Sequence, residues 1–144
     1  MRRILLGLGV AGLAMAAFTG NPARVSAAAA PQAAADAATL KMYNDKVVPI
    51  FQANCYRCHG GVNHRGGLTF DTKAGMEKGG HGGKVIVPGH PEDSVLVKLI
   101  RHEGPKDDPK DMPPNKPKIS DADIATVEQW VKAGAIMPED APKP

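Results

Sequence analysis

The chain has few aromatic residues and few thiols. Its 144 residues include one Trp, two Tyr, three Phe and two Cys. Small domains bury a modest share of their surface and often need a metal or a covalent link for stability. In an oxidising compartment, two thiols alone would ordinarily suggest one disulfide. Here the close spacing of the two cysteines argues against that interpretation, as shown below.

The chain also lacks an apolar run of about 20 residues, the length that a membrane-spanning helix needs. Its main apolar run extends from Ile4 to about Phe18, directly after Arg2 and Arg3. Small residues follow, with Val25-Ser26-Ala27 as one candidate cleavage site and Ala14-Met15-Ala16 as another. This order of basic, apolar and small residues is typical of a secretory signal peptide. We therefore expect residues 1–27 to be removed on export to the periplasm, with no membrane insertion of the mature chain. An uncleaved membrane anchor is the alternative.

The sequence also lacks a large excess of charged residues of one sign. The full chain has 18 basic and 15 acidic residues, a formal net charge of +3. Cleavage after Ala27 would remove Arg2, Arg3 and Arg24 and no acidic residue, which leaves 15 of each sign. A nucleic-acid partner would call for a basic surplus on one face. We expect no such partner.

Composition and periodicity divide the chain into four segments. They are the signal peptide at residues 1–27, a flexible Ala-rich leader at 28–39, a folded domain at 40–136 and a disordered tail at 137–144. Within the domain, apolar periodicity and capping residues predict helices. The expected helices cover residues 42–54, 71–76, 91–102 and 120–134, with Gly- and Pro-rich loops between them. Pro49 conflicts with the first helix unless that helix starts nearby or kinks.

The most specific motif is Cys55-Tyr56-Arg57-Cys58-His59. The pattern C-x-x-C-H is typical of covalent attachment of a c-type haem. The two thiols can add across the haem vinyl groups, and the imidazole of His59 can then reach the iron. One alternative is a thioredoxin-like redox pair, which requires a βαβ context that is missing here. Another is half of a zinc site, which requires further clustered Cys or His.

A low-spin electron carrier needs a second axial ligand, for which Met112 is the preferred candidate. Pro113 and Pro114 follow it and would stiffen the loop in an extended conformation. A thioether ligand raises the reduction potential relative to two imidazoles. Other candidates are weaker: Met42, Met76 and Met137, and the histidines His64, His81, His90 and His102.

Several motifs together resemble the planctomycete-type cytochrome c domain, a divergent branch of the mono-haem cytochromes c. The similar region runs from Val47 to Gly134. Its matching pieces are Val48-Pro49-Ile50, Asn54 to Gly60, Gly66-Gly67-Leu68, Val87-Pro88-Gly89, Pro91 to Ser94, Met112-Pro113-Pro114, Ile119-Ser120-Asp121 and Trp130 to Gly134. The resemblance implies the all-α small cytochrome c fold, three to four helices around a covalently bound haem, with the first and last helices packed across each other. It also implies haem attachment at Cys55 and Cys58, with His59 and Met112 as axial ligands.

The functional expectation is a carrier of single electrons between redox proteins, with one covalent haem c per chain and no enzymatic activity of its own. A haem enzyme or gas-binding protein with an open sixth position is one alternative. A haem module that docks onto a larger redox complex is another. The charged loop at residues 106–111 is expected to be a solvated rim. Arg57, Tyr56 or nearby lysines are candidates to neutralise a haem propionate.

Overall fold

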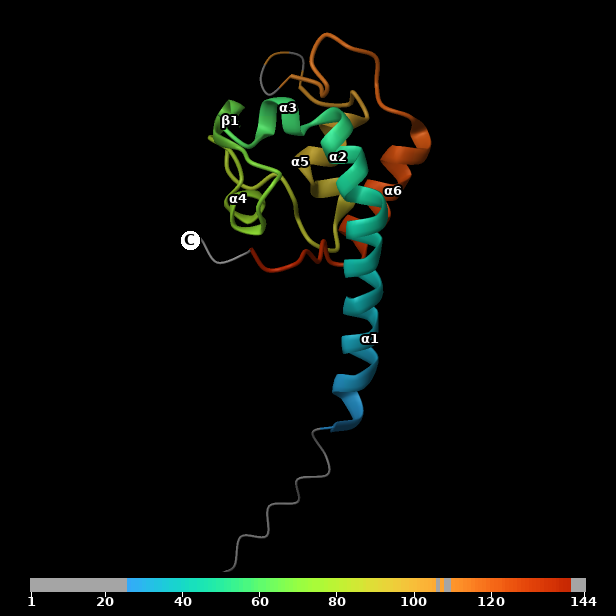
Figure 1. The fold of residues 1–144 in the computed structure, drawn as a ribbon. Coiled ribbons are helices and arrows are strands. Elements are labelled where there is room, and N and C mark those ends of the chain that lie inside the picture. The colour runs from blue at the N-terminus through green and yellow to red at the C-terminus, as the bar shows by residue number, and fades with distance from the viewer. Residues whose placement is uncertain (1–25, 106, 108–109, 141–144) are drawn as a thin grey trace, which may run out of the picture.

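The computed structural model describes residues 26–105, 107 and 110–140, and the side chains from residue 31 onward. The regular secondary structure of the described residues is helical apart from one two-residue strand, so the predicted all-α class is confirmed. The elements are α1 (Ser26–Met42), the π-helical turn η2 (Tyr43–Val47), α2 (Val48–Asn54), α3 (Tyr56–His59), β1 (Asn63–His64), the 3₁₀ turn η3 (Arg65–Gly67), α4 (Lys73–Lys78), the 3₁₀ turn η4 (Pro91–Asp93), α5 (Val95–Ile100) and α6 (Asp121–Lys132). Figure 1 shows α1 extending well beyond the body that the other elements form.

The segment predicted as a flexible leader, residues 28–39, is helical in the structure and belongs to α1. The expectation was wrong about conformation because Ala is the strongest helix former, even where the helix has no apolar face to bury. Residues 31–38 are almost all solvent-exposed, and Thr39 is the first buried residue. The compact body therefore begins close to the predicted position, Leu40.

Pro49 is accommodated by a change of helix type. The backbone runs from α1 through the π-helical turn η2 into α2, where Pro49 occupies the second position. A proline has no N–H to donate and is tolerated in the first turn of a helix, where that N–H would have no partner. The wider turn shifts the hydrogen-bond register, so the missing donor falls at the start of a new helical segment.

A small aromatic core joins the beginning and the end of the domain. Trp130 of α6 is fully buried, and its ring lies 5.2 Å from that of Tyr43 in η2. Phe51 of α2 meets Trp130 edge-on at 5.9 Å. The indole Nε1 of Trp130 donates a hydrogen bond to the carbonyl of Ile136 at 2.9 Å. Side by side in Figure 1, η2 and α6 show the expected packing of the first and last helices of the domain.

The helix predicted at residues 91–102 is not continuous in the structure, so this prediction was wrong. Pro91–Asp93 form a 3₁₀ turn, Ser94 is extended, and α5 starts only at Val95. Ser94 is fully buried, and its hydroxyl binds two backbone groups of the preceding loop. The N–H of Val87 donates to Oγ at 2.9 Å, and Oγ donates to the carbonyl of His90 at 2.9 Å. These bonds compete with the helical conformation at this position.

Two smaller predictions need correction. The short helix expected at residues 71–76 is α4, two residues later, and it is capped by Thr72 rather than Asp71. The disordered tail expected at residues 137–144 is ordered in its described part, because Met137 is buried and Asp140 accepts hydrogen bonds from the backbone N–H groups of Lys73 and Ala74. Residues 141–144 lie outside the described residues. The last helix, by contrast, is capped by Ser120 as predicted.

Of the helices that the structure describes, none has the length and apolar character needed to cross a membrane. The predicted signal peptide covers residues 1–27, of which residues 1–25 lie outside the described part of the chain. Cleavage and export therefore stay predictions.

We expect the substitution Ser94→Ala to lower the free energy of unfolding of the haem-loaded protein by about 1–3 kcal/mol, because it leaves buried backbone groups without a partner. Gln129→Ala, an exposed position on α6, is the control and should change that free energy by less than about 0.5 kcal/mol. Urea denaturation followed by tryptophan fluorescence measures both. Equal effects of the two substitutions would contradict a structural role for the Ser94 hydroxyl.

Candidate functional site

A cavity of about 600 Å³ lies between two walls of the domain. We call residues 54–70, which include α3 and η3, one wall, and α5 with Pro105 and residues 110–119 the other. Residues 80–85 complete the described lining. Its apolar lining includes Leu68, Leu96 and Leu99. The size falls within the range of about 300–1,000 Å³ that is usual for cofactor sites. All four residues predicted from the sequence line this one cavity: Cys55, Cys58, His59 and Met112.

The spacing of the motif is explained by a single helical turn. Cys55 ends α2 and caps α3, and its carbonyl accepts hydrogen bonds from the N–H groups of Cys58 at 3.0 Å and His59 at 2.9 Å. Residues at positions i, i+3 and i+4 of a helix lie on the same face. The turn therefore presents both thiols and the imidazole to the same cavity. A different spacing would turn one of the three away.

His59 is anchored to the core through Phe70. The backbone N–H of Phe70 donates to the His59 carbonyl at 2.6 Å, and the two rings lie 5.6 Å apart. Phe70 in turn stacks on Phe51 at 5.0 Å. Burial lowers the pKa of His59, and the nearby backbone of Leu68 and Arg65 offsets part of that effect. The neutral imidazole is the form that binds a metal.

One nitrogen of that imidazole has no partner. The Nδ1 atom of His59 is buried and makes no hydrogen bond within the described part of the protein. A ligating histidine usually donates its second ring N–H to a backbone carbonyl or a carboxylate. The backbone of Leu68 and Arg65 lies close enough to affect the pKa of the ring, so carbonyl acceptors are near at hand.

The two thiols are free and partly buried. Burial first, and then the proximity of Cys58, raises the pKa of Cys55 to about 12. A thioredoxin-like pair needs the opposite, a thiol whose pKa is lowered. Neither cysteine belongs to a group of three or more potential metal ligands among the described residues, which argues against half of a zinc site. Both alternatives considered for the motif are therefore disfavoured.

Met112 belongs to the opposite wall. Its backbone N–H donates to the carbonyl of Leu99 in α5 at 3.0 Å, and its side chain is half-buried. Pro113 and Pro114 also line the cavity. The peptide bond between Met112 and Pro113 is cis, which differs from the extended conformation expected for this loop.

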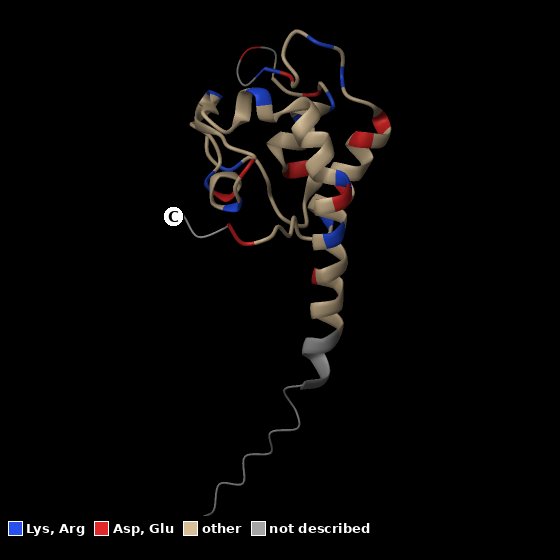
Figure 2. Ribbon diagram, in the orientation of Figure 1, with Lys and Arg blue, Asp and Glu red and all other residues tan. Residues whose placement is uncertain are grey.

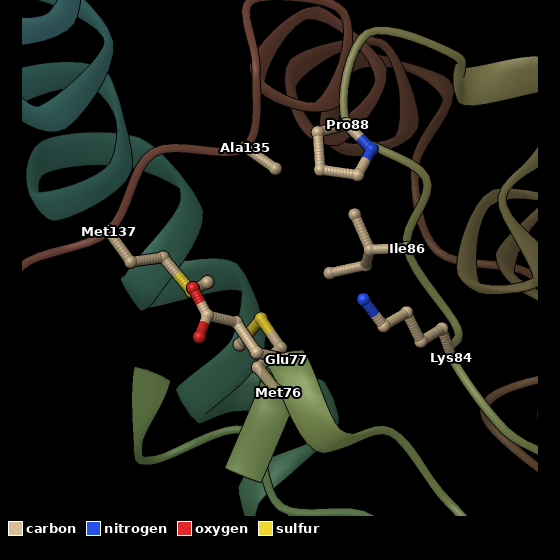
Figure 3. Close-up of a pocket in the computed structure, with 7 residues that line it drawn as sticks. All are labelled: Met76, Glu77, Lys84, Ile86, Pro88, Ala135 and Met137. Carbon is tan, nitrogen blue, oxygen red and sulfur yellow. The ribbon is translucent and has the colours of Figure 1, made fainter. Parts of the chain in front are cut away.

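The other methionines lie elsewhere. Met76 and Met137 are buried around a second, smaller cavity of about 200 Å³, which Figure 3 shows. Met42 packs against the hydrophobic core. Among the described methionines, Met112 alone lines the larger cavity.

Of the histidines considered as alternatives to Met112 for the second axial ligand, one remains a candidate. Only His81, of the four other histidines, lines the larger cavity. Its backbone N–H donates to the carbonyl of Gly66, on the same wall as His59. His64 contacts the carbonyl of Gly61, and His90 lies beside Glu92. His102 follows α5, and its Nε2 atom is buried without a hydrogen-bond partner within the described residues.

Cationic side chains at the cavity were not assigned from the sequence. Arg65, Lys84, Lys98 and Lys110 line it, and no Asp or Glu is among its described lining residues. These four come from four separate segments, so no local motif indicates that they converge. Of the charged loop at residues 106–111, Lys106 and Asp108 lie outside the described residues, and Lys110 reaches the cavity.

The cavity fits a haem by the chemistry of its walls. Two thiols and an imidazole line it on one helical turn, a thioether lines the other wall, and apolar side chains complete the lining. Thiols, imidazole and thioether are the groups that hold haem in c-type cytochromes.

Comparison with known proteins identifies the same region. Residues 55–116 match a family model described as Planctomycete cytochrome C. No curated protein and no solved structure matches the chain. The matched segment starts at the first cysteine of the motif and ends four residues after Met112, and it confirms the resemblance predicted from the sequence. Residues 55–116 are thus similar to the planctomycete cytochrome c family, and this similarity indicates a haem-binding electron-transfer domain.

Proposed function

We propose that this protein is an exported mono-haem c-type cytochrome that carries single electrons between redox partners. Cys55 and Cys58 hold the haem covalently, and His59 and Met112 are its axial ligands. The observation that supports this most strongly is that these four side chains, separated by up to 57 positions, line one cavity with apolar walls.

Each wall has a distinct role in this proposal. The turn from Cys55 to His59 binds the haem and orients the imidazole through its anchor on Phe70. The opposite wall presents the Met112 thioether from a loop that is tied to α5 by a backbone hydrogen bond. When bound, the haem supplies the one-electron Fe³⁺/Fe²⁺ couple.

The apolar lining is expected to exclude water. Leu68, Leu99 and Ile119 contribute to it from both walls. A dry, apolar shell disfavours the more highly charged ferric form, and a thioether ligand does the same. We therefore expect a higher reduction potential than in a protein with two imidazole ligands.

Export to the periplasm is part of the proposal. It rests on the pattern of residues 1–27, where Arg2 and Arg3 precede an apolar run and small residues. The partners are expected to be redox proteins, in keeping with the family.

The first prediction concerns covalent attachment. Coexpressed with cytochrome c maturation machinery, the protein should keep one haem per chain after denaturation, detected by haem staining of a denaturing gel and by intact mass. The double variant Cys55→Ala/Cys58→Ala should lose all haem on denaturation, because no thioether can form. Loss of haem from the unmodified protein would refute c-type attachment.

The second prediction concerns the sixth ligand. Met112→His should keep a low-spin spectrum but lower the midpoint potential, because imidazole stabilises the ferric iron more than a thioether does. Met112→Ala should open the position, so that added imidazole or carbon monoxide binds readily. Visible spectroscopy and potentiometric titration measure both effects.

Met137→Leu is the matched control, a thioether removed from the smaller cavity with little change in volume. It should leave the spectrum and the potential unchanged. An unchanged spectrum in Met112→Ala would assign the ligand elsewhere, with His81 the next residue to test. Ready binding of carbon monoxide by the unmodified protein would favour the haem enzyme or gas-binding alternative.

A further inference from the structure

The described charged residues that line the larger cavity are all basic. Arg65, Lys84, Lys98 and Lys110 line it, and its described lining contains no carboxylate. Elsewhere on the body, basic and acidic residues are intermixed along the ribbon (Figure 2). A net neutral chain, as expected after cleavage, thus places a local surplus of cations around one site. Such a surplus favours an anionic ligand.

Of the four cations, Arg65 and Lys98 are the best placed to bind an anion in this cavity, because each of the other two has a complication. Lys84 also lines the smaller cavity, and Figure 3 shows its side chain pointing into it. Lys110 is close in sequence to Met112, so its substitution would disturb the proposed ligand loop. Arg65 in η3 and Lys98 in α5 stand on opposite walls and carry neither complication.

Neither of these two charges is neutralised by the protein where the structure describes it. The ion pairs there use other cations, for example Arg101 with Glu128 at 2.6 Å, and none includes Arg65 or Lys98. Arg65 lies six residues after His59 and lines the same cavity.

We propose that Arg65 and Lys98 form the binding subsite for the haem propionates, one cation from each wall of the cavity. This inference rests on the proposed haem binding and adds to it the residues that receive the carboxylates. Tyr56 and Arg57, which the sequence offered as candidates, do not line the cavity.

The chemistry of the two side chains suits this role. A carboxylate placed against an apolar wall is costly unless a cation pairs with it. The planar guanidinium of Arg65 can donate two parallel hydrogen bonds to one carboxylate, and the Lys98 ammonium can act as a point charge for the other. The same cations disfavour the additional positive charge of the ferric form, so they raise the reduction potential.

The test uses five variants of the haem-loaded protein. Arg65→Gln and Lys98→Gln each remove one charge from the cavity. Arg57→Gln is the matched control for the first, an exposed arginine outside the cavity eight positions earlier. Lys78→Gln is the control for the second, because both lysines are exposed and lie in the last turn of a six-residue helix.

Two readouts are compared, the midpoint potential and the redox-induced infrared difference spectrum with isotope-labelled propionates. Each cavity variant should lower the midpoint potential by up to about 59 mV. For a one-electron couple, this corresponds to about a tenfold change in the equilibrium between the oxidised and reduced forms. Each should also shift a propionate carboxylate band. Arg65→Lys should restore most of the potential but not the band position, because it keeps the charge and loses the two-pronged geometry.

The outcomes separate this inference from the proposed function. If the haem stays covalently bound and the cavity variants match their controls in both readouts, the propionate subsite is refuted while the cytochrome assignment stands. If the unmodified protein loses its haem on denaturation, c-type attachment fails, and that result is obtained before any charge variant is measured. Shifts confined to Arg65→Gln and Lys98→Gln support the proposal.

Discussion

The backbone hydrogen bond from Phe70 to the carbonyl of His59 connects the site to the rest of the domain. It holds the end of α3, and with it the turn that carries both thiols and the imidazole. The ring of Phe70 lies 5.0 Å from that of Phe51, and the ring of Phe51 lies 5.9 Å from that of Trp130. These aromatic contacts connect the turn to α6. Three aromatic residues therefore fix one wall of the cavity against the last helix.

The opposite wall is attached by independent means. The N–H of Met112 binds the carbonyl of Leu99, so the position of this loop follows that of α5. The start of α5 is set by Ser94, whose buried hydroxyl holds the preceding loop. The two walls thus approach each other without a shared sheet or a long helix between them. This explains how a chain with long Gly- and Pro-rich loops can still place residues 55–59 and 112 at one site.

Local patterns predicted the parts of the structure that local physics determines. The motif from Cys55 to His59 requires only the period of a helix, and the cap at Ser120 requires only its own hydroxyl and the N–H of Asp123. The two prolines that follow Met112 indicated it as the second axial ligand, and the family resemblance implied the same residue. The elements that were wrong depend on distant contacts. Ser94 interrupts a helix because of a loop seven residues earlier, and the tail is ordered because Asp140 reaches the start of α4.

The cations that line the cavity could not be predicted from local sequence either, because their proximity depends on contacts between distant segments. Arg65 and Lys98 are 33 positions apart and belong to different walls. Each alone resembles any solvated surface residue, and only the tertiary structure shows that they share a lining without a described carboxylate. The leader at residues 28–39 is a different case, because there the high helix propensity of Ala acts without any packing partner.

The arrangement of the two walls suits a carrier of single electrons better than it suits a catalyst. An electron carrier works best when its metal ligands keep the same positions in both oxidation states, because little then has to move with the electron. His59 is held by a backbone bond of 2.6 Å and an aromatic contact, and Met112 by a backbone bond of 3.0 Å to a buried helix residue. Both proposed ligands are thus restrained by main-chain contacts that a change in iron charge does not alter. A catalyst would instead need one of these positions to open for substrate. The part of the structure that would have to yield is the Met112 loop, which is tied to α5 by the Leu99 bond and has no aromatic anchor like that of His59.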